Sequence, residues 1–371
     1  MNKNSKNTYL DFCSDRVLKI KDLIESSTTT SVIGIPGVGI SVFLKHLSIQ
    51  PFGYSIYVDV FGLPNLTSAE LFKDILSKLG GETIAKDEAE IVTECKRVLE
   101  KLVGKNEKVI IYFGGFDQLK KSFNQDFFHH LRSLRNINQK KVVFIFGICR
   151  RIDSLVSENL VDIDLNMLSS VYYLKPYEKK DLLYILSIYG PKSTDTDLEK
   201  ILSLSGGHFQ FLQLLLRSER LHDPLHDPFI KLSLRNIYQH LTYQQKKILK
   251  KVTSQNISEV KDDYLINVGL VQKLDDKYEI FSPLFEQFIK SQSSLKLPVK
   301  EARLLKILKD NIGETVHKDK IFNFVWESEI DNASDWALDA LIYRLRRNPT
   351  FISKGYVIEN HKKLGYSLLK N

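Results

Sequence analysis

A glycine-rich segment near the start of the chain, residues 34–41 (GIPGVGIS), lies between an apolar strand-like run and a helical run. In that setting, backbone N–H groups at the start of a helix can bind phosphate. The spacing matches the P-loop pattern G-x-x-x-x-G-K-[ST] at Gly34, Gly39 and Ser41. It fails at the lysine, whose place is taken by Ile40, a residue without charge. The segment therefore predicts an α/β fold built around a loop that has lost its main phosphate-neutralising group.

The segments that surround this loop alternate between apolar strands and helices. Strand-length apolar runs occur at Ser31–Gly34, Tyr54–Val60, Lys108–Phe113 and Lys141–Ile148, and residues with helical spacing fill the intervals. The last two runs lack polar alternation, which is typical of strands buried on both faces. We therefore expect a parallel sheet covered by helices on both sides, within a domain of residues 1–174.

A second feature concerns catalysis. In P-loop enzymes a later apolar strand ends in an aspartate that helps to hold Mg²⁺. Here the strand Val109–Phe113 is followed by Gly114, and the next carboxylate is Asp117. Without the lysine and this aspartate, most of the electrostatic stabilisation of phosphoryl transfer is absent. We predict a pseudo-ATPase with no catalytic residues and no required cofactor. The loop could still hold ATP or ADP weakly, or serve only to connect strand and helix.

The chain beyond residue 174 is mainly helical and divides into smaller modules. Short helices and the turn Ser205–His208 predict a helical lid and linker at 175–228, ending in the tandem tetrapeptide Leu221–Pro228. Residues 229–295 follow the order of three helices and a strand pair. Residues 296–371 repeat that order and end in a hairpin.

Four pieces give residues 11–290 a family resemblance. They are GIPGVG at 34–39, VIIYFGGFDQL at 109–119, VVFIFGICR at 142–150 and LSGGHFQFL at 204–212. Together they resemble the ATPase core of the STAND and origin-recognition branch of the AAA+ superfamily. The resemblance implies a γ-phosphate-sensing position at Arg150 and a winged helix at 229–295, although Phe209 replaces the proline usual in the lid signature. The candidate nucleotide-binding residues are then Gly34, Pro36, Gly37, Val38, Gly39, Ser41, Asp117 and Arg150.

The C-terminal segment from Leu297 onward carries a different resemblance. Val325-Trp326, LDALIYRLRR at 338–347 and LGYSL at 364–368 are similar to the winged-helix effector domain of response-regulator transcription factors. In that family the third helix enters the major groove of DNA and the hairpin wing touches its backbone or minor groove. The resemblance places the exposed face of Asp335–Arg347 on DNA. The candidate DNA-binding residues are Trp336, Tyr343, Arg344, Arg346 and Arg347 on the helix, and Lys362 and Lys363 on the wing.

The charge balance bears on this assignment. The chain has a net charge of +8, and the segment from Lys296 has 14 Lys and Arg against 10 Asp and Glu. A basic excess fits a nucleic-acid partner, although a lysine-rich protein of another kind would have the same balance. Asp331, Asp335 and Asp339 place negative charge at the front of the presumed recognition helix, where it would repel phosphate. A protein-docking role is the alternative.

The positions of the cysteines and the hydropathy of the chain indicate in which cellular compartment the protein is expected. Cys13, Cys95 and Cys149 are far apart and lack metal-ligand spacing, so we expect no metal site and a reducing cytoplasm. No apolar run is long enough for a membrane span, and the first six residues are polar without an apolar segment behind them. We expect a cytoplasmic protein that makes no contact with a membrane.

These observations lead to one interpretation with two alternatives. The fold class is α/β: a P-loop parallel-sheet domain with a helical lid, followed by two winged-helix domains at 229–295 and 296–371. The function expected is that of a regulator or recruitment factor that binds double-stranded DNA and uses its inactive ATPase core for protein contacts or self-assembly. The first alternative is an active nucleotide-dependent switch with a non-standard site. The second is a scaffold that binds only proteins through its winged helices.

Overall fold

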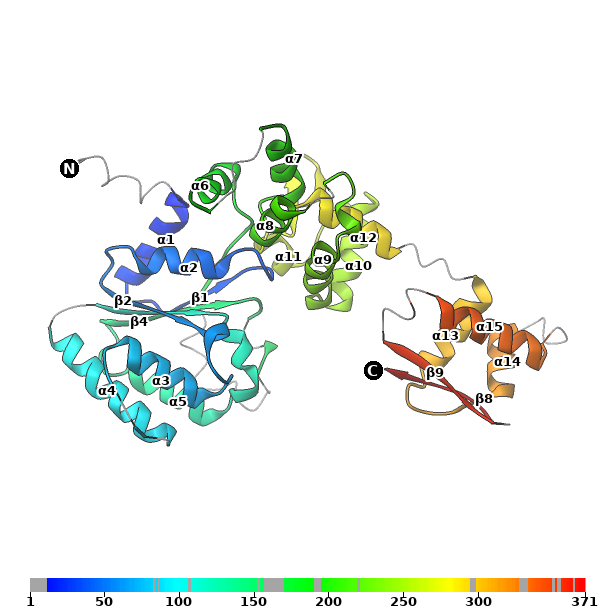
Figure 1. Cartoon of the computed structure of the whole chain (residues 1–371), viewed down its shortest axis with the longest axis horizontal. Helices are drawn as coiled ribbons and strands as arrows, with labels where there is room; N and C mark the ends of the chain where they lie inside the picture. Colours follow the sequence, from blue (N-terminus) through cyan, green and yellow to red (C-terminus); the bar gives the residue numbers. More distant parts are fainter. Residues whose placement is uncertain are drawn as a thin grey trace. The chain divides into compact units, whose positions relative to one another are not determined.

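The protein, analysed as a computed structural model, divides into two compact units, Met1–Lys290 and Ser291–Asn371 (Figure 1). Each unit has its own hydrophobic core and is described by itself. The finer division at residues 174 and 228 stays a prediction. The structure describes residues 12–82, 84–85, 87–105, 108–151, 154–156, 170–189, 195–218, 221–293, 298–326, 333–348, 351, 355–362 and 364–370.

A five-stranded parallel sheet forms the centre of the first unit. Its strands, in the order β2-β3-β4-β1-β5, are Tyr54–Asp59, Val109–Gly114, Val142–Ile148, Thr30–Ile33 and Val171–Tyr173. All residues of β3 and β4 are buried, which confirms the expectation drawn from their apolar composition, and all four residues of β1 are buried as well. The edge strand β5 was not predicted, because three half-buried residues give no periodic signal.

Helices cover both faces of this sheet. α1 (Ser14–Glu25) and α2 (Ile40–Ser48) lie on one face, and α3 (Ser68–Lys78), α4 (Glu88–Gly104) and α5 (Gln125–Arg135) lie on the other (Figure 1). Side chains of Thr67, Asp87 and Asn124 accept hydrogen bonds from backbone N–H groups in the first turns of α3, α4 and α5. Such caps stabilise a helix start by about 1 kcal/mol each. The sheet is therefore an α/β sandwich, as predicted.

The remainder of the first unit is helical and shares the core of the sheet domain. α6 (Lys179–Tyr189), α7 (Asp195–Ser205) and α8 (Phe209–Arg217) occupy the predicted lid. A second helical group follows, in which β6 and β7 form a hairpin before the last helix. Its elements are α9 (Pro228–His240), α10 (Tyr243–Thr253), α11 (Asp263–Asn267), β6 (Val271–Leu274), β7 (Lys277–Ile280) and α12 (Pro283–Ser293).

The second unit has winged-helix architecture. Three helices, α13 (Val299–Lys309), α14 (Lys318–Trp326) and α15 (Asp335–Arg347), pack with an antiparallel sheet in the order β8-β10-β9. Its strands are Val316–His317, Gly365–Lys370 and Tyr356–His361. α15 buries Leu338, Leu341, Ile342 and Leu345, which recur at helical spacing along the segment that the sequence places on a helix. No helix in the described part of either unit is long and apolar enough to cross a membrane.

Candidate nucleotide and DNA sites

The glycine-rich loop connects β1 to α2, as its sequence predicts. Gly37 and Gly39 have φ angles of +79° and +110°, in the left-handed region that side chains other than glycine rarely adopt. Gly34, Pro36 and Val38 are buried, and Ser41 is half-buried at the start of α2. Both left-handed positions of this loop therefore favour glycine.

The carbonyl groups of this loop are bound by the chain that follows the sheet. The Pro36 carbonyl lies 2.9 Å from Nε2 of His208, and the Gly37 carbonyl accepts from the backbone N–H of Gln210 at 3.0 Å. The Tyr177 hydroxyl donates to the Gly39 carbonyl at 2.9 Å. A Cβ atom at Gly37 would lie 2.3 Å from Oε1 of Gln210, which is far closer than real contacts. The lid is thus docked directly on the loop.

The hydrogen bonds of His208 show which of its ring nitrogens carries the proton. It is fully buried at the start of α8, and burial lowers its pKa to about 4. Nδ1 accepts a hydrogen bond from the backbone N–H of Phe211, so Nε2 carries the proton and donates to Pro36. In the sequence, His208 was noted only as part of the lid signature, and neither Tyr177 nor Gln210 was predicted to contact the loop. Their partners depend on tertiary docking, which leaves no local signal.

The two positions that differ from the P-loop pattern have apolar or aromatic neighbours. Ile40 is 9 % exposed, and its Cγ2 would lie 2.7 Å from a Cβ placed on Gly147 of β4. Gly114 ends β3, and a Cβ there would lie 2.0 Å from the hydroxyl oxygen of Tyr57. Burial raises the pKa of Tyr57 to about 12, and its Ser41 neighbour opposes that rise. An aspartate at position 114 would therefore require the Tyr57 side chain to move.

One carboxylate beside Gly114 was not predicted from the sequence. Asp59, the last residue of β2, is in register with Gly114 on β3. Its Oδ2 atom lies 3.4 Å from Nζ of Lys45 on α2, and both side chains are more than a third exposed. The available signal was an acidic residue at the end of the second strand, since neighbouring parallel strands end at the same edge of a sheet.

Asp117 and Arg150 lie close to the C-terminal end of β4. Oδ2 of Asp117 accepts from the backbone N–H of Cys149 at 3.3 Å, and burial raises the pKa of this aspartate. Nε of Arg150 donates to Nε2 of His240 on α9 at 3.1 Å. Burial lowers the pKa of His240 to about 4, and the same Nε2 atom also lies 3.0 Å from the Cys149 carbonyl. The two predicted nucleotide-binding side chains are therefore engaged with backbone and helix partners.

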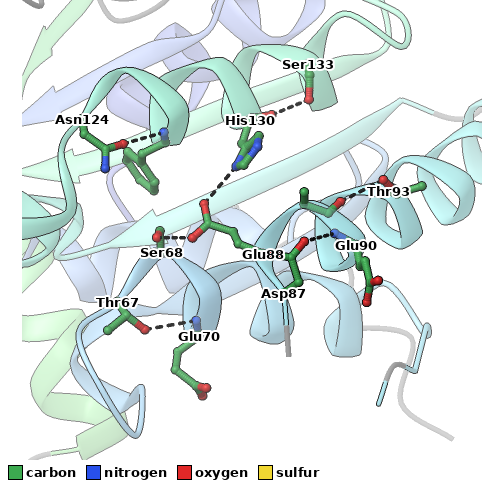
Figure 2. A network of polar contacts seen from close by, with 12 residues as sticks. Thr67, Ser68, Glu70, Asp87, Glu88, Glu90, Thr93, Asn124, His130 and Ser133 are labelled. Atoms are coloured by element: carbon green, nitrogen blue, oxygen red, sulfur yellow. Dashed lines mark hydrogen bonds and ion pairs between the residues drawn. The ribbon is translucent and has the colours of Figure 1, made fainter. Parts of the chain in front are cut away.

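A polar cluster on the other face of the sheet resembles a catalytic triad only in its composition. Oε1 of Glu88 lies 2.9 Å from Nδ1 of His130, and the Ser68 hydroxyl donates to the second carboxylate oxygen (Figure 2). In a Ser-His-acid triad the imidazole lies between the other two groups, where it takes the hydroxyl proton. Here the carboxylate lies in the middle. The cluster therefore joins α3, α4 and α5 and does not activate Ser68.

The predicted DNA-binding residues lie on the solvent face of α15 and on the wing. Nε of Arg344 donates to Oε1 of Glu301 at 2.8 Å, and Arg346 donates to the Ile358 carbonyl at 2.7 Å. The Arg347 guanidinium lies 4.7 Å from the ring centroid of Tyr343. These contacts hold the basic end of α15 against α13 and the wing.

Other members of the predicted set are more accessible. The Trp336 side chain is 81 % exposed and Tyr343 is 56 % exposed. Lys362 is exposed at the turn between β9 and β10, whereas Lys363 lies outside the described residues. Asp335 pairs with Nζ of Lys318 at 2.9 Å, and Asp339 accepts a hydrogen bond from the Tyr366 hydroxyl. Asp335 therefore has a cationic partner within the unit, whereas Asp339 has a neutral hydrogen-bond donor.

Comparison with protein-family models gives a match for the C-terminal unit. Residues 292–368 match the family model described as transcriptional regulatory protein, C terminal. No curated protein sequence matches the chain. The C-terminal unit is thus of the transcriptional-regulator type, as its sequence pieces predicted.

Several solved structures are similar to the whole chain or to most of it. The Aeropyrum pernix ORC1 protein in complex with DNA is 13 % identical, with a TM-score of 0.45 over 98 % of this chain and 90 % of that one. The ADP form of the Aeropyrum pernix ORC2 protein is 12 % identical, with a TM-score of 0.48 over 79 % and 97 %. Cdc6p from Pyrobaculum aerophilum is 11 % identical, with a TM-score of 0.42 over 97 % and 91 %.

Proposed function

We propose that this protein is a regulator or recruitment factor that binds double-stranded DNA through its C-terminal unit. The α/β unit acts as a platform that does not hydrolyse ATP. The observation that carries the DNA part is the agreement between the family match over 292–368 and the solvent face of α15. A winged helix offers its third helix to the major groove and its hairpin to the backbone.

The charges of the second unit support this assignment. Arg347 and Lys362 are exposed cations on the helix and the wing, and Asp335 and Asp339 are both engaged by groups of the same unit. The internal contacts of Arg344 and Arg346 orient the basic end of α15 relative to the wing. Phosphate contacts of this kind position a protein on DNA and make its affinity dependent on salt.

The inactive core is the second part of the proposal. Its support is the replacement of two charged positions by Ile40 and Gly114, together with the docking of Tyr177 and His208 on the loop carbonyls. Phosphoryl transfer relies on cations placed around the phosphate oxygens. We infer that ATP and ADP are not required and that the docked lid makes the unit a fixed surface for protein partners or self-assembly.

A salt series tests the DNA part. Fluorescence anisotropy would follow the binding of a labelled duplex to the full chain and to the double variant Arg347→Ala, Lys362→Ala. Loss of two phosphate contacts should weaken binding and reduce the slope of log affinity against log salt by about 2. The matched control is Lys273→Ala, Lys277→Ala on the exposed hairpin of the first unit. An unchanged slope in the first variant, or an equal change in the control, would count against this assignment.

A further inference from the structure

The solvent face of α15 combines aromatic and basic side chains, and the arginines among them have contacts within the unit. Of its three arginines, Arg344 is bound to Glu301 and Arg346 to a wing carbonyl. The third, Arg347, lies over the ring of Tyr343. One N–H group of Arg344 and one of Arg346 are therefore used within the unit, which leaves fewer donors for the hydrogen bonds to guanine that arginine commonly makes.

The first turn of this face carries a large and exposed aromatic side chain. Trp336 is 81 % exposed and lies in the first turn of α15, the part of a recognition helix that contacts base edges. Tyr343 lies seven residues later, on the same side of the helix and about 10 Å farther along its axis. Tryptophan buries a large area when it is covered by a partner, and it is enriched among the interface residues that contribute about 2 kcal/mol or more to binding.

The major groove offers one apolar group to such a ring. The C5 methyl of thymine is the hydrophobic feature of the groove, and it distinguishes thymine from every other base there. We propose that α15 reads thymine-containing base pairs by apolar contact between Trp336 and thymine methyl groups. The proposal rests on the proposed DNA-binding function and adds the base class and the residue that selects it.

The test removes the methyl group without changing the hydrogen-bonding pattern. The full chain would be titrated into labelled 24-base-pair duplexes of alternating dA and dT, and into the same duplexes with deoxyuridine in place of thymidine. Each methyl buried against Trp336 should raise affinity about fourfold. We expect the thymidine duplex to bind at least fourfold more tightly than the deoxyuridine duplex. Trp336→Ala should remove that difference.

The matched control is Tyr243→Ala, which removes an aromatic side chain that is 78 % exposed in the first unit. This variant should keep the preference for thymidine. Equal binding of the two duplexes by the unaltered protein would overturn the proposal, as would a preference that survives Trp336→Ala. A failure to bind any duplex would overturn the proposed function itself. The fold of Trp336→Ala is checked by the fluorescence of Trp326, which is 4 % exposed in the same unit.

Discussion

The docking of the lid on the glycine-rich loop predicts a specific dependence of stability on pH. His208 is buried with a pKa of about 4, whereas the same side chain in the unfolded chain titrates near 6.5. Between these values the unfolded state binds a proton that the folded state does not. The contribution is therefore fully present above pH 6.5 and is lost as the pH falls toward 4.

The variant His208→Gln isolates this term. A glutamine amide can donate to the Pro36 carbonyl but leaves the buried N–H of Phe211 without its acceptor, which should cost about 1–3 kcal/mol at pH 7.5. Between pH 7.5 and 4.5 the unaltered protein should lose about 2.5 kcal/mol through His208, whereas the variant cannot lose it. The stability of the unaltered protein relative to the variant should therefore fall by about 2.5 kcal/mol over this range, and the order of the two proteins reverses if the gap at pH 7.5 is smaller than that.

Urea unfolding at a series of pH values measures the difference. Both tryptophans, Trp326 and Trp336, belong to the second unit, so their fluorescence follows that unit while far-ultraviolet circular dichroism also reports the first. The control is His222→Gln, at an exposed position of the first unit. If the difference in unfolding free energy between His208→Gln and the unaltered protein stays constant from pH 7.5 to 4.5, the assignment of His208 as a neutral buried imidazole is wrong.

Three further predictions concern other contacts. Ile40→Lys should leave phosphate release from ATP at background and destabilise the first unit by about 2 kcal/mol, because the new ammonium group would be buried beside β4; ATP turnover would contradict this. Lys108→Met should lower the melting temperature of the first unit, since Nζ donates to two carbonyls at the end of α1 at 2.6 and 3.0 Å. An unchanged melting temperature would show that these bonds do not stabilise the unit. Glu301→Ala should destabilise the second unit by about 1–2 kcal/mol in tryptophan-monitored unfolding, because Arg344 loses a 94 % buried partner. A variant as stable as the unaltered protein would refute this contribution of the ion pair.

Local patterns were sufficient for elements whose burial follows their own sequence. α15 spans Asp335–Arg347, as predicted, because four apolar residues at helical spacing face the core and the Ser334 hydroxyl caps its first turn. The strands β3 and β4 were found in the same way, since every residue in them is buried. In these segments local preference and tertiary burial agree.

Contacts between distant segments left no comparable signal. The bond from Tyr177 to the Gly39 carbonyl joins residues 138 positions apart, and neither side chain type nor spacing indicates it. Arg346 was predicted to face DNA from its place on a basic helix end, but its guanidinium also binds the Ile358 carbonyl of the wing. Such pairings depend on how packed elements approach one another, which residue patterns do not determine.

The most direct test is anisotropy binding of one labelled duplex to the full chain and to a chain shortened at residue 293, each with and without Mg-ATP. The shortened chain keeps the core of the first unit and lacks the second. We predict that the full chain binds, that the shortened chain does not, and that Mg-ATP leaves the affinity of the full chain unchanged. Binding by the shortened chain, or affinity that depends on Mg-ATP, would contradict a DNA-binding C-terminal unit carried by an inactive ATPase core.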